Sequence, residues 1–284
     1  MAFGPERCEE RMSSDIIQSA QNYWDIAANN YDQVFPCTLV GRAQREAVWR
    51  ELESVFRPGE RILELNCGTG IDALHLAEKG MRIVACDISP RMIELARHRA
   101  ALSNYRELID YRVLATEDLA RLADEGQFDG AFSNFSGLNC VEDLSAVARN
   151  LSRVLKTGAR VLLCMMGRYC LWEIAWYLAH GEPRKALRRL KPGSTSRRGD
   201  SAKVRVYHWR VDRVANMFAP NFRLRRQVGI GVTLPPSYCE HWVRHFSRVF
   251  DGLRRIDRWL GCVPVLRNTG DCVLLQFEHV NSDR

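Results

Sequence analysis

The sequence predicts an α/β protein in which helices cover both faces of a mostly parallel sheet. Two observations lead to this fold class. From Pro58 onward, short apolar runs alternate with longer amphipathic segments, as expected for strands joined by crossover helices. The helix starts are also marked, since Ser89 can cap one helix with Pro90 in its first turn, and Asp143 suits the positive end of another. Because crossover connections join parallel strands, the sheet is expected to lie buried between two helical layers.

The expected elements follow one another in a regular order. Two helices come first, over residues 15–30 and 41–56, with a break at Pro36 between them. Strands are expected over 61–65, 81–86, 109–114, 128–134 and 159–166. Helices fill the gaps near 70–79, 89–103 and 141–155, and Gly158 is expected to end the last of them.

The alternation lapses after residue 167 and resumes near residue 218. A helix is expected over 170–190, followed by a polar linker rich in Pro, Gly and Ser over 191–203 and a short strand over 203–209. The regular pattern returns with a strand over 222–232, a long helix over 237–260 and a final strand over 270–279. We therefore interpret residues 167–217 as an insertion into the α/β unit.

Composition limits the class of protein. With 284 residues, 46% of them hydrophobic, the chain can bury a large core. No strongly apolar segment reaches the roughly 18 to 20 residues that span a bilayer, and the first residues do not resemble a secretory signal. The ten cysteines lack a C-x-x-C pair or zinc spacing, which favours reduced thiols. We expect a soluble, cytoplasmic protein.

Positive charge is concentrated in one region. The chain carries a formal charge of +7, but residues 182–226 alone hold 14 Lys or Arg against three acids. This stretch is compatible with an anionic small molecule, with peripheral contact to an anionic membrane, with RNA, or with a plain solvated basic face. RNA is the least favoured of these because no RNA-binding domain is recognisable.

A glycine-rich turn and two acids form the main candidate site. The turn 66–70 follows the first strand, and ligands bind at the carboxyl ends of parallel strands. Its glycines let backbone N–H groups approach a ligand closely. Asp87 is at the end of the second strand, where a carboxylate can accept hydrogen bonds from both hydroxyls of a ribose. A nicotinamide or flavin site uses a similar turn, but Glu64, inside the end of the first strand, departs from that pattern and suits a cationic ligand or a firmly held loop.

The stretches ILELNCGTG and VACDIS resemble the class I S-adenosylmethionine-dependent methyltransferase family. The resemblance covers roughly residues 58–166 and, more loosely, the last strands. It departs from the family's first motif once, because Asn66 occupies the first glycine position. The resemblance implies a Rossmann-like fold with seven strands, the last of them antiparallel. It also implies S-adenosyl-L-methionine as cofactor and S-adenosyl-L-homocysteine as product.

The same resemblance assigns roles within the site. By it, Glu64 helps hold the methionine end of the cofactor, and Asp87 holds the ribose. LATEDLARL resembles the family's adenine-contacting segment, and FDGAFSNFSGLN resembles the segment that faces the transferring methyl group. The cofactor-binding residues expected from these matches are Glu64, Asn66, Cys67, Gly68, Gly70, Asp87, Ile88, Thr116, Glu117, Asn134 and Phe135.

Catalysis of methyl transfer rests mainly on alignment of the acceptor, so a strong catalytic signature is not required. His208 is the candidate base, because the ordinary pKa of histidine suits proton acceptance near neutral pH. Tyr31 is a second candidate, because similar N-terminal segments of the family close over the cofactor. Trp172, Trp176 and Tyr207 are expected to contact the acceptor.

These inferences define the expected organisation and activity. The chain is divided into a helical N-terminal cap (1–57), a cofactor-binding core (58–166), a substrate lid (167–217) and the remainder of the core (218–284). The expected reaction methylates oxygen or nitrogen, with carbon as a further option, of a small molecule with an anionic or apolar part. The alternatives are a regulator that binds the cofactor without turnover and a methyltransferase acting on a lipid or RNA. No metal is expected, since His241 and His245 lack a third ligand.

Overall fold

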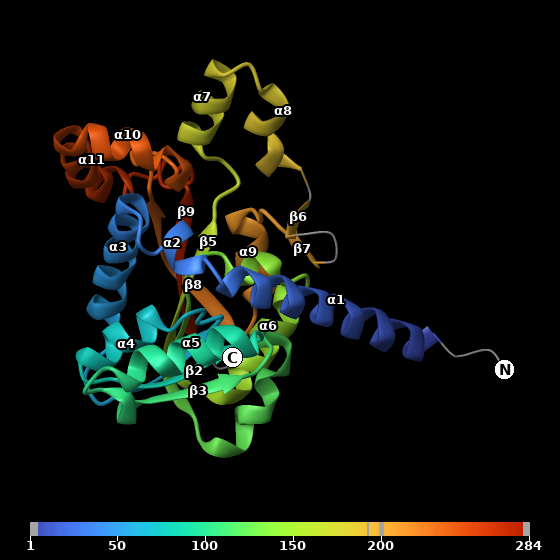
Figure 1. Ribbon diagram of the computed structural model, residues 1–284. Helices are drawn as coiled ribbons and strands as arrows, with labels where there is room; N and C mark the ends of the chain where they lie inside the picture. The colour runs from blue at the N-terminus through green and yellow to red at the C-terminus, as the bar shows by residue number, and fades with distance from the viewer. Residues whose placement is uncertain (1–4, 192, 199–201, 281–284) are drawn as a thin grey trace.

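The order of the strands defines the fold. The computed structural model describes the backbone of residues 5–191, 193–198 and 202–280 (Figure 1). One seven-stranded sheet has the order β3-β2-β1-β4-β5-β9-β8. Its strands are β1 (Arg61–Leu65), β2 (Arg82–Asp87), β3 (Ile109–Val113), β4 (Phe128–Ser133), β5 (Leu155–Met166), β8 (Phe222–Ile230) and β9 (Cys272–His279). β9 runs antiparallel to β5 and β8, whereas β1 to β5 pair in parallel, which confirms the predicted sheet.

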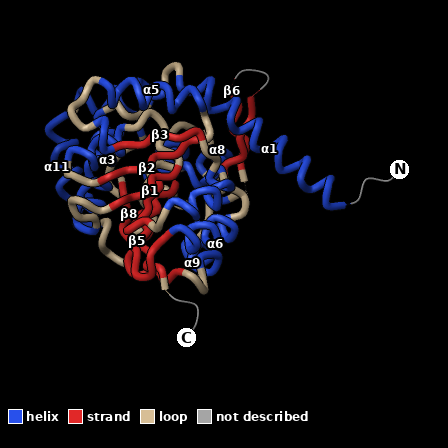
Figure 2. The backbone as a smooth tube through the Cα atoms, turned by 90° about the horizontal axis from the view of Figure 1, so that it is seen from below, coloured by secondary structure: helices blue, strands red, loops and turns tan. Residues whose placement is uncertain are grey.

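Helices cover both faces of this sheet, as Figure 2 shows. Ile62 and Leu63 are neighbours on β1 and point to opposite faces, yet both are fully buried. Leu63 belongs to the core shared with α6, α9 and η2, and Ile62 to the core shared with α3, α4 and α5. These helices are α3 (Leu39–Val55), α4 (Ile71–Glu78), α5 (Pro90–Ala101), α6 (Leu144–Val154), α9 (Val211–Phe218) and the 3-10 helix η2 (Thr116–Glu125).

The N-terminal cap is shorter than predicted. α1 (Pro5–Ala28) and α2 (Tyr31–Val34) lie outside the two layers, and α1 extends beyond the core in Figure 1. The expected cap of residues 1–57 also includes α3, but α3 buries Val48 and Leu52 against the sheet. The amphipathic face of α3 therefore makes it part of the core, and the cap consists of α1 and α2.

The insertion holds three helical pieces and a hairpin. α7 (Leu171–Ala179), α8 (Pro183–Ala186) and the 3-10 helix η4 (Arg188–Leu190) stand above the sheet in Figure 1. The predicted linker over 191–203 is wrong, because β6 (Ser194–Arg198) pairs with β7 (Ala202–Val206) in an antiparallel hairpin. α1 packs on this hairpin through Tyr23. The insertion also ends before residue 217, since α9 lies in a core layer.

Two predicted boundaries differ from the structure. The expected helix over 237–260 is divided into η5 (Ser237–Cys239), α10 (Glu240–His245) and α11 (Ser247–Leu260), because Phe246 leaves the helical region (φ −111°, ψ 47°). Gly158 does not end a helix, because it lies within β5 with φ 83°. A short 3-10 helix, η1 (Arg106–Leu108), precedes β3, and another, η3 (Gly137–Cys140), follows β4. Across the described residues, none of the helices combines the length and apolarity that crossing a bilayer requires.

Candidate active site

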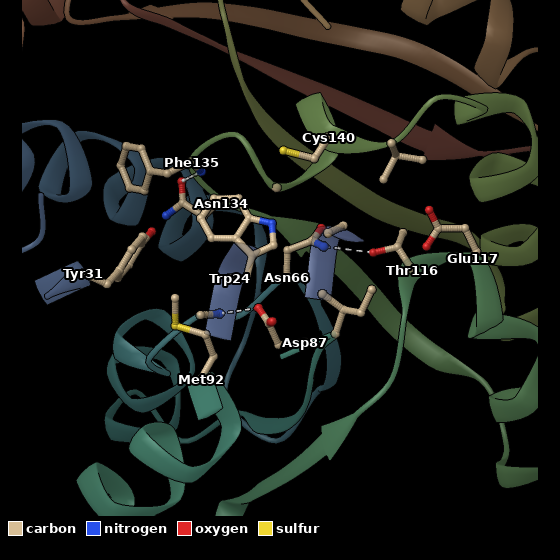
Figure 3. A pocket seen from close by; sticks show the side chains of 15 residues that line it. Trp24, Tyr31, Asn66, Asp87, Met92, Thr116, Glu117, Asn134, Phe135 and Cys140 are labelled. Carbon is tan, nitrogen blue, oxygen red and sulfur yellow. Dashed lines mark hydrogen bonds between the residues drawn. The ribbon is translucent and has the colours of Figure 1, made fainter. Parts of the chain in front are cut away.

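A cavity lies at the carboxyl ends of β1, β2 and β4, beside α1 (Figure 3). It encloses about 630 Å³ of empty space, open mouth included. Most of the predicted cofactor-binding residues line it, namely Asn66, Gly68, Asp87, Ile88, Thr116, Glu117, Asn134 and Phe135. The fold therefore brings together four loops that are far apart in the sequence.

The glycine-rich turn uses left-handed backbone at three positions. Asn66 (φ 56°), Gly68 (φ 54°) and Gly70 (φ 75°) all have positive φ. Asn tolerates this region better than most side chains, which explains how Asn66 replaces a glycine. Gly68 lines the cavity, but Gly70 does not. A Cβ on Gly70 would lie 2.6 Å from the Tyr111 hydroxyl oxygen and 2.7 Å from Ala96 Cβ, so Gly70 permits close helix packing.

Asp87 holds the two turns of the site together. Its carboxylate accepts hydrogen bonds from the backbone N–H of Gly68 and of Ser89, both at 2.9 Å. Burial raises the pKa of Asp87 to about 6. Cys67, between these groups, is buried and does not line the cavity, and burial raises the pKa of its thiol. Asp87 is thus the acidic group that the cavity presents beside the turn.

The buried carboxylate of Glu64 bears on whether these residues fit the implied cofactor. Its side chain is 1% exposed, and it accepts a hydrogen bond from the backbone of Ala73. Its second oxygen, Oε2, has no partner among the described residues. Burial, reinforced by Asp72, raises the pKa of Glu64. A cationic N–H donor is the chemistry that satisfies such a carboxylate, so Glu64 fits the ammonium of a bound amino-acid moiety, although it does not itself line the cavity.

The side chain of Asn66 links two other segments of the site by hydrogen bonds. Its amide nitrogen donates to Thr116 Oγ1 at 3.0 Å (Figure 3), and its oxygen accepts from the Ser133 hydroxyl at 3.2 Å. Glu117 follows Thr116 on η2, and burial raises the pKa of its carboxyl. The replacement of glycine by Asn66 therefore adds a bridge between β1, η2 and β4.

Two carboxylates fasten the cap to the turns of the site. Asp25 of α1 accepts a hydrogen bond from Ser89 Oγ at 2.5 Å. Asp32 of α2 accepts from Thr69 Oγ1 at 2.7 Å and pairs with Arg99. Each cap helix is thus held to a different loop, one beside Asp87 and one within the glycine-rich turn.

Several lining residues were not predicted from the sequence. Ala20 and Trp24 of α1 line the cavity, with the Trp24 indole near its centre in Figure 3. Their i, i+4 spacing places them on one helix face, which was the available signal. The others come from α5, η3 and the residue after η3, and they are Met92, Gly137, Cys140 and Val141.

A second cavity adjoins the first. Trp24, Tyr31 and Phe135 line both, so these three side chains form the boundary between them. The second cavity encloses about 770 Å³ of empty space, open mouth included. Phe35 contacts Phe135 edge to face at 4.9 Å between ring centres and forms part of its apolar wall. Its polar lining consists mainly of Gln44, Glu173, Arg188, Arg189 and Asp271.

The two proposed catalytic residues lie in different surroundings. Tyr31 borders both cavities, and burial raises the pKa of its hydroxyl to about 12, so the hydroxyl keeps its proton at neutral pH. His208 lines neither cavity. Burial, followed by the charge of Arg189, lowers the pKa of His208 to about 4. The structure therefore does not place His208 where it can take a proton from a molecule in either cavity.

The three predicted acceptor contacts do not line the second cavity. Trp172 donates its indole N–H to the backbone oxygen of Thr233 at 2.7 Å, and Trp176 stacks on His180. Tyr207 stacks on Trp209. α7 of the insertion instead contributes Glu173 to the cavity, because Trp172 of α7 packs against Trp242 of α10.

Part of the basic stretch is paired with acids. Arg188 and Arg189 bind Glu173, and Arg210 binds Asp212. Further along, Arg225 pairs with Glu278 and Arg226 with Glu51. These pairs offset part of the positive charge that the sequence concentrates here.

Comparison with known proteins identifies the central region. Residues 63–163 match the family model described as a methyltransferase domain. A demethylmenaquinone methyltransferase of Symbiobacterium thermophilum is 33% identical over 51% of this chain and 58% of its own length. A ubiquinone biosynthesis O-methyltransferase of Xanthomonas oryzae is 34% identical over 39% of this chain and 44% of its own length. The chain thus spans about half the length of these curated relatives.

The fold has wider similarity among solved structures. The [4+2]-cyclase SpnF superposes with a TM-score of 0.60 at 16% identity, over 93% of this chain and 96% of that one. At this identity the likeness concerns the fold alone. Because that protein is a [4+2]-cyclase, the fold does not by itself decide the reaction.

Proposed function

We propose that this chain, as a class I S-adenosylmethionine-dependent methyltransferase, methylates a small molecule whose reacting atom lies between the two cavities. The cofactor of this family, S-adenosylmethionine, supplies an electrophilic methyl group on a sulfonium. The single observation that carries the proposal is the cavity around Asp87 and Gly68, most of whose lining residues belong to the matched methyltransferase domain.

The residues of the first cavity have complementary tasks in this proposal. In this proposal, Asp87 accepts hydrogen bonds from the ribose hydroxyls. The unpartnered oxygen of Glu64 accepts a hydrogen bond from the ammonium of the methionine moiety. Thr116 and Glu117 line the same cavity as Asp87 and suit the adenine. Because both ends of the cofactor would be held, its reactive centre is directed toward the boundary formed by Tyr31 and Phe135.

The chain's contribution to the chemical step is alignment. Tyr31, Phe135 and Trp24 restrict how a nucleophile in the second cavity can face the first, and such positioning contributes much of the rate in two-substrate reactions. The protonated Tyr31 hydroxyl can donate a hydrogen bond at this boundary. A carboxylate base is not free in the second cavity, because Glu173 and Asp271 are both bound by Arg189.

The class of acceptor follows from the same surroundings. The names of the relatives refer to demethylmenaquinone and to ubiquinone biosynthesis, which favours an aromatic acceptor for this chain too. The pairing of Arg188 and Arg189 with Glu173 favours an apolar acceptor over an anionic one. Contact with an anionic membrane remains a subordinate proposal, supported by exposed Leu178 and Leu187 on the lid.

The proposal is tested by cofactor binding followed by turnover. Calorimetry should show binding of S-adenosylmethionine and S-adenosylhomocysteine and no binding of NAD. Incubation with demethylated quinones and simple phenols should then release S-adenosylhomocysteine, measured by chromatography. Binding without release on any acceptor would favour the regulator, and preferential binding of NAD would refute the family assignment of the site.

A further inference from the structure

The lining of the second cavity combines aromatic residues with charged residues. Phe35, Phe135, Tyr31 and Trp24 give it an aromatic side next to the first cavity. Its lining also includes an ion network centred on Glu173, whose side chain is only 1% exposed.

The ion network has no charge left over. Arg188 binds both oxygens of Glu173, at 2.7 and 3.0 Å. Arg189 Nη2 bridges Glu173 Oε2 at 2.7 Å and Asp271 Oδ1 at 2.6 Å. Arg189 Nη1 donates to the backbone oxygens of Asp271, at 2.9 Å, and Gly167, at 3.3 Å. Two arginines thus neutralise two acids, so the cavity offers neither a free cation for an anionic ligand nor a free carboxylate for a cationic one.

Gln44 is the exception within this wall. Its amide nitrogen donates to Asp271 Oδ2 at 3.1 Å, which fixes the orientation of the amide because a carboxylate can only accept. The amide oxygen, Oε1, is then directed elsewhere, and it has no hydrogen-bond partner among the described residues. The side chain of Gln44 is fully buried. A buried acceptor without a donor is costly, so a ligand that brings a hydroxyl or N–H gains what the free protein lacks.

We propose that the cavity lined by Phe35, Gln44 and Asp271 binds the methyl acceptor as an uncharged aromatic molecule that donates a hydrogen bond to Gln44 Oε1. This inference rests on the proposed function for the position of the cofactor. It adds the substrate class, and it makes Gln44 a specificity-determining residue. The aromatic rings of the acceptor pack against Phe35 and Phe135, and its polar group distinguishes it from simple hydrocarbons.

Three naphthalenes of nearly equal size test this selectivity. 2-Naphthol is neutral at pH 7 and has a donor, 2-methoxynaphthalene has no donor, and 2-naphthoate is anionic. With S-adenosylhomocysteine bound, 2-naphthol should bind about tenfold more tightly than either of the others, as expected when a buried acceptor is satisfied only by a donor. Equal affinities, or tightest binding of 2-naphthoate, would overturn the proposal.

Variants locate the effect. Gln44→Met keeps the length of the side chain and removes the acceptor, so it should reduce 2-naphthol affinity to that of 2-methoxynaphthalene. The matched control is Gln33→Met, because Gln33 is exposed and lines neither cavity, and it should change nothing. Ser237→Trp, from a partly exposed position in the wall, should block all three probes. Unchanged 2-naphthol binding in Ser237→Trp would show that the probe binds elsewhere and refute the assignment.

The measurements distinguish failure of the acceptor assignment from failure of the proposed function. S-adenosylhomocysteine affinity is measured first for every protein and should stay within about twofold in all variants. If the wild-type protein binds S-adenosylhomocysteine but shows no preference for 2-naphthol, the acceptor assignment fails while the proposed function stands. If S-adenosylhomocysteine itself does not bind, the proposed function fails. Should Gln44→Met not fold, the three wild-type affinities and Ser237→Trp still decide the outcome.

Discussion

At the scale of single residues, the buried carboxylate of Asp87 makes cofactor binding sensitive to pH. Burial raises its pKa to about 6, and its ionised form is the better acceptor for ribose hydroxyls. Affinity for S-adenosylhomocysteine should therefore be full above pH 7 and should fall as the pH is lowered through 6, where the carboxyl takes up a proton. Calorimetry between pH 5 and pH 8 measures this fall.

Asp87→Asn separates this contribution from that of Glu64, whose pKa is also raised by burial. The variant should bind at least about tenfold more weakly at pH 7.5, because charge-assisted hydrogen bonds are each worth roughly 1.5–3 kcal/mol. Its affinity should change less between pH 7 and pH 5 than that of the wild type. An identical pH profile in both proteins would mean that Asp87 does not contact the cofactor in its ionised form.

The two glycines of the turn should respond differently to the same substitution. Both positions have positive φ, which Ala adopts only at a cost, but Gly70→Ala also places a Cβ 2.6 Å from the Tyr111 hydroxyl oxygen, so it should lower the melting temperature more. In Gly68→Ala the nearest atom to the new Cβ is a Tyr31 ring carbon at 3.7 Å, an ordinary contact. Gly68→Ala should stay nearer wild-type stability but lose cofactor affinity, since its Cβ enters the cavity. Thermal unfolding and calorimetry on both variants check this, and equal loss of stability would contradict the distinction.

Residues of the first cavity were predictable where the signal is local. Gly68 lies in the turn after β1 and Asp87 is the last residue of the neighbouring β2, so a short stretch of sequence already places them at one edge of the sheet. Gln44 and Asp271 were not predictable, because they are 227 positions apart and meet only after the sheet is complete. His208 was assigned from the ordinary pKa of histidine, but burial changes that pKa and no sequence pattern reveals the burial.

At the scale of elements, the carboxylates of α1 and α2 should control how fast the cofactor leaves. Asp32 joins α2 to Thr69 and Arg99, and both cap helices border the cavity through Trp24 and Tyr31. Asp32→Asn weakens this attachment and should speed dissociation of S-adenosylhomocysteine several-fold, with a smaller effect on the association rate. Stopped-flow fluorescence measures both rates.

A matched control distinguishes attachment of the cap from a general effect of lost charge. Asp212 pairs with Arg210 on the exposed surface, and surface pairs contribute little. Asp212→Asn should leave dissociation unchanged. If Asp32→Asn also leaves it unchanged while the protein remains folded, the cap does not limit cofactor release.

Elements were predicted best where they carry the parallel sheet. The strands from 61 to 134 and the antiparallel strand near 272 were found because each is a short apolar run between turn signals. In the hairpin, a strand was expected over 203–209, where β7 lies, but β6 was read as part of a linker, since its polar sequence pairs with β7 under the cover of Tyr23 from α1. The short helices α10 and α11 were merged because periodicity does not reveal a break at one residue such as Phe246.

At the scale of the whole molecule, one buried carboxylate joins the core to the site. Asp72, at the start of α4, accepts hydrogen bonds from Arg45 at 2.5 Å and from the Trp49 indole at 2.6 Å, both on α3. It also accepts from Asn134, which lines the first cavity, at 3.0 Å. The side chains of Arg45 and Asp72 are 7% and 5% exposed. Asp72 therefore couples a core helix, the sheet and the wall of the site.

Asp72→Ala should consequently affect stability and binding together. It leaves Arg45 buried without its partner, and breaking a buried pair in this way costs about 3–5 kcal/mol. For a chain of this size that corresponds to a fall in melting temperature of roughly 10 °C, measured by circular dichroism. Asp110→Ala, which removes a half-exposed partner of Arg112, should lower it far less. Because Asn134 loses its anchor, S-adenosylhomocysteine should also bind more weakly to Asp72→Ala at a temperature where the variant is fully folded. A melting temperature within about 2 °C of wild type would show that the buried pair does not hold α3 to the core.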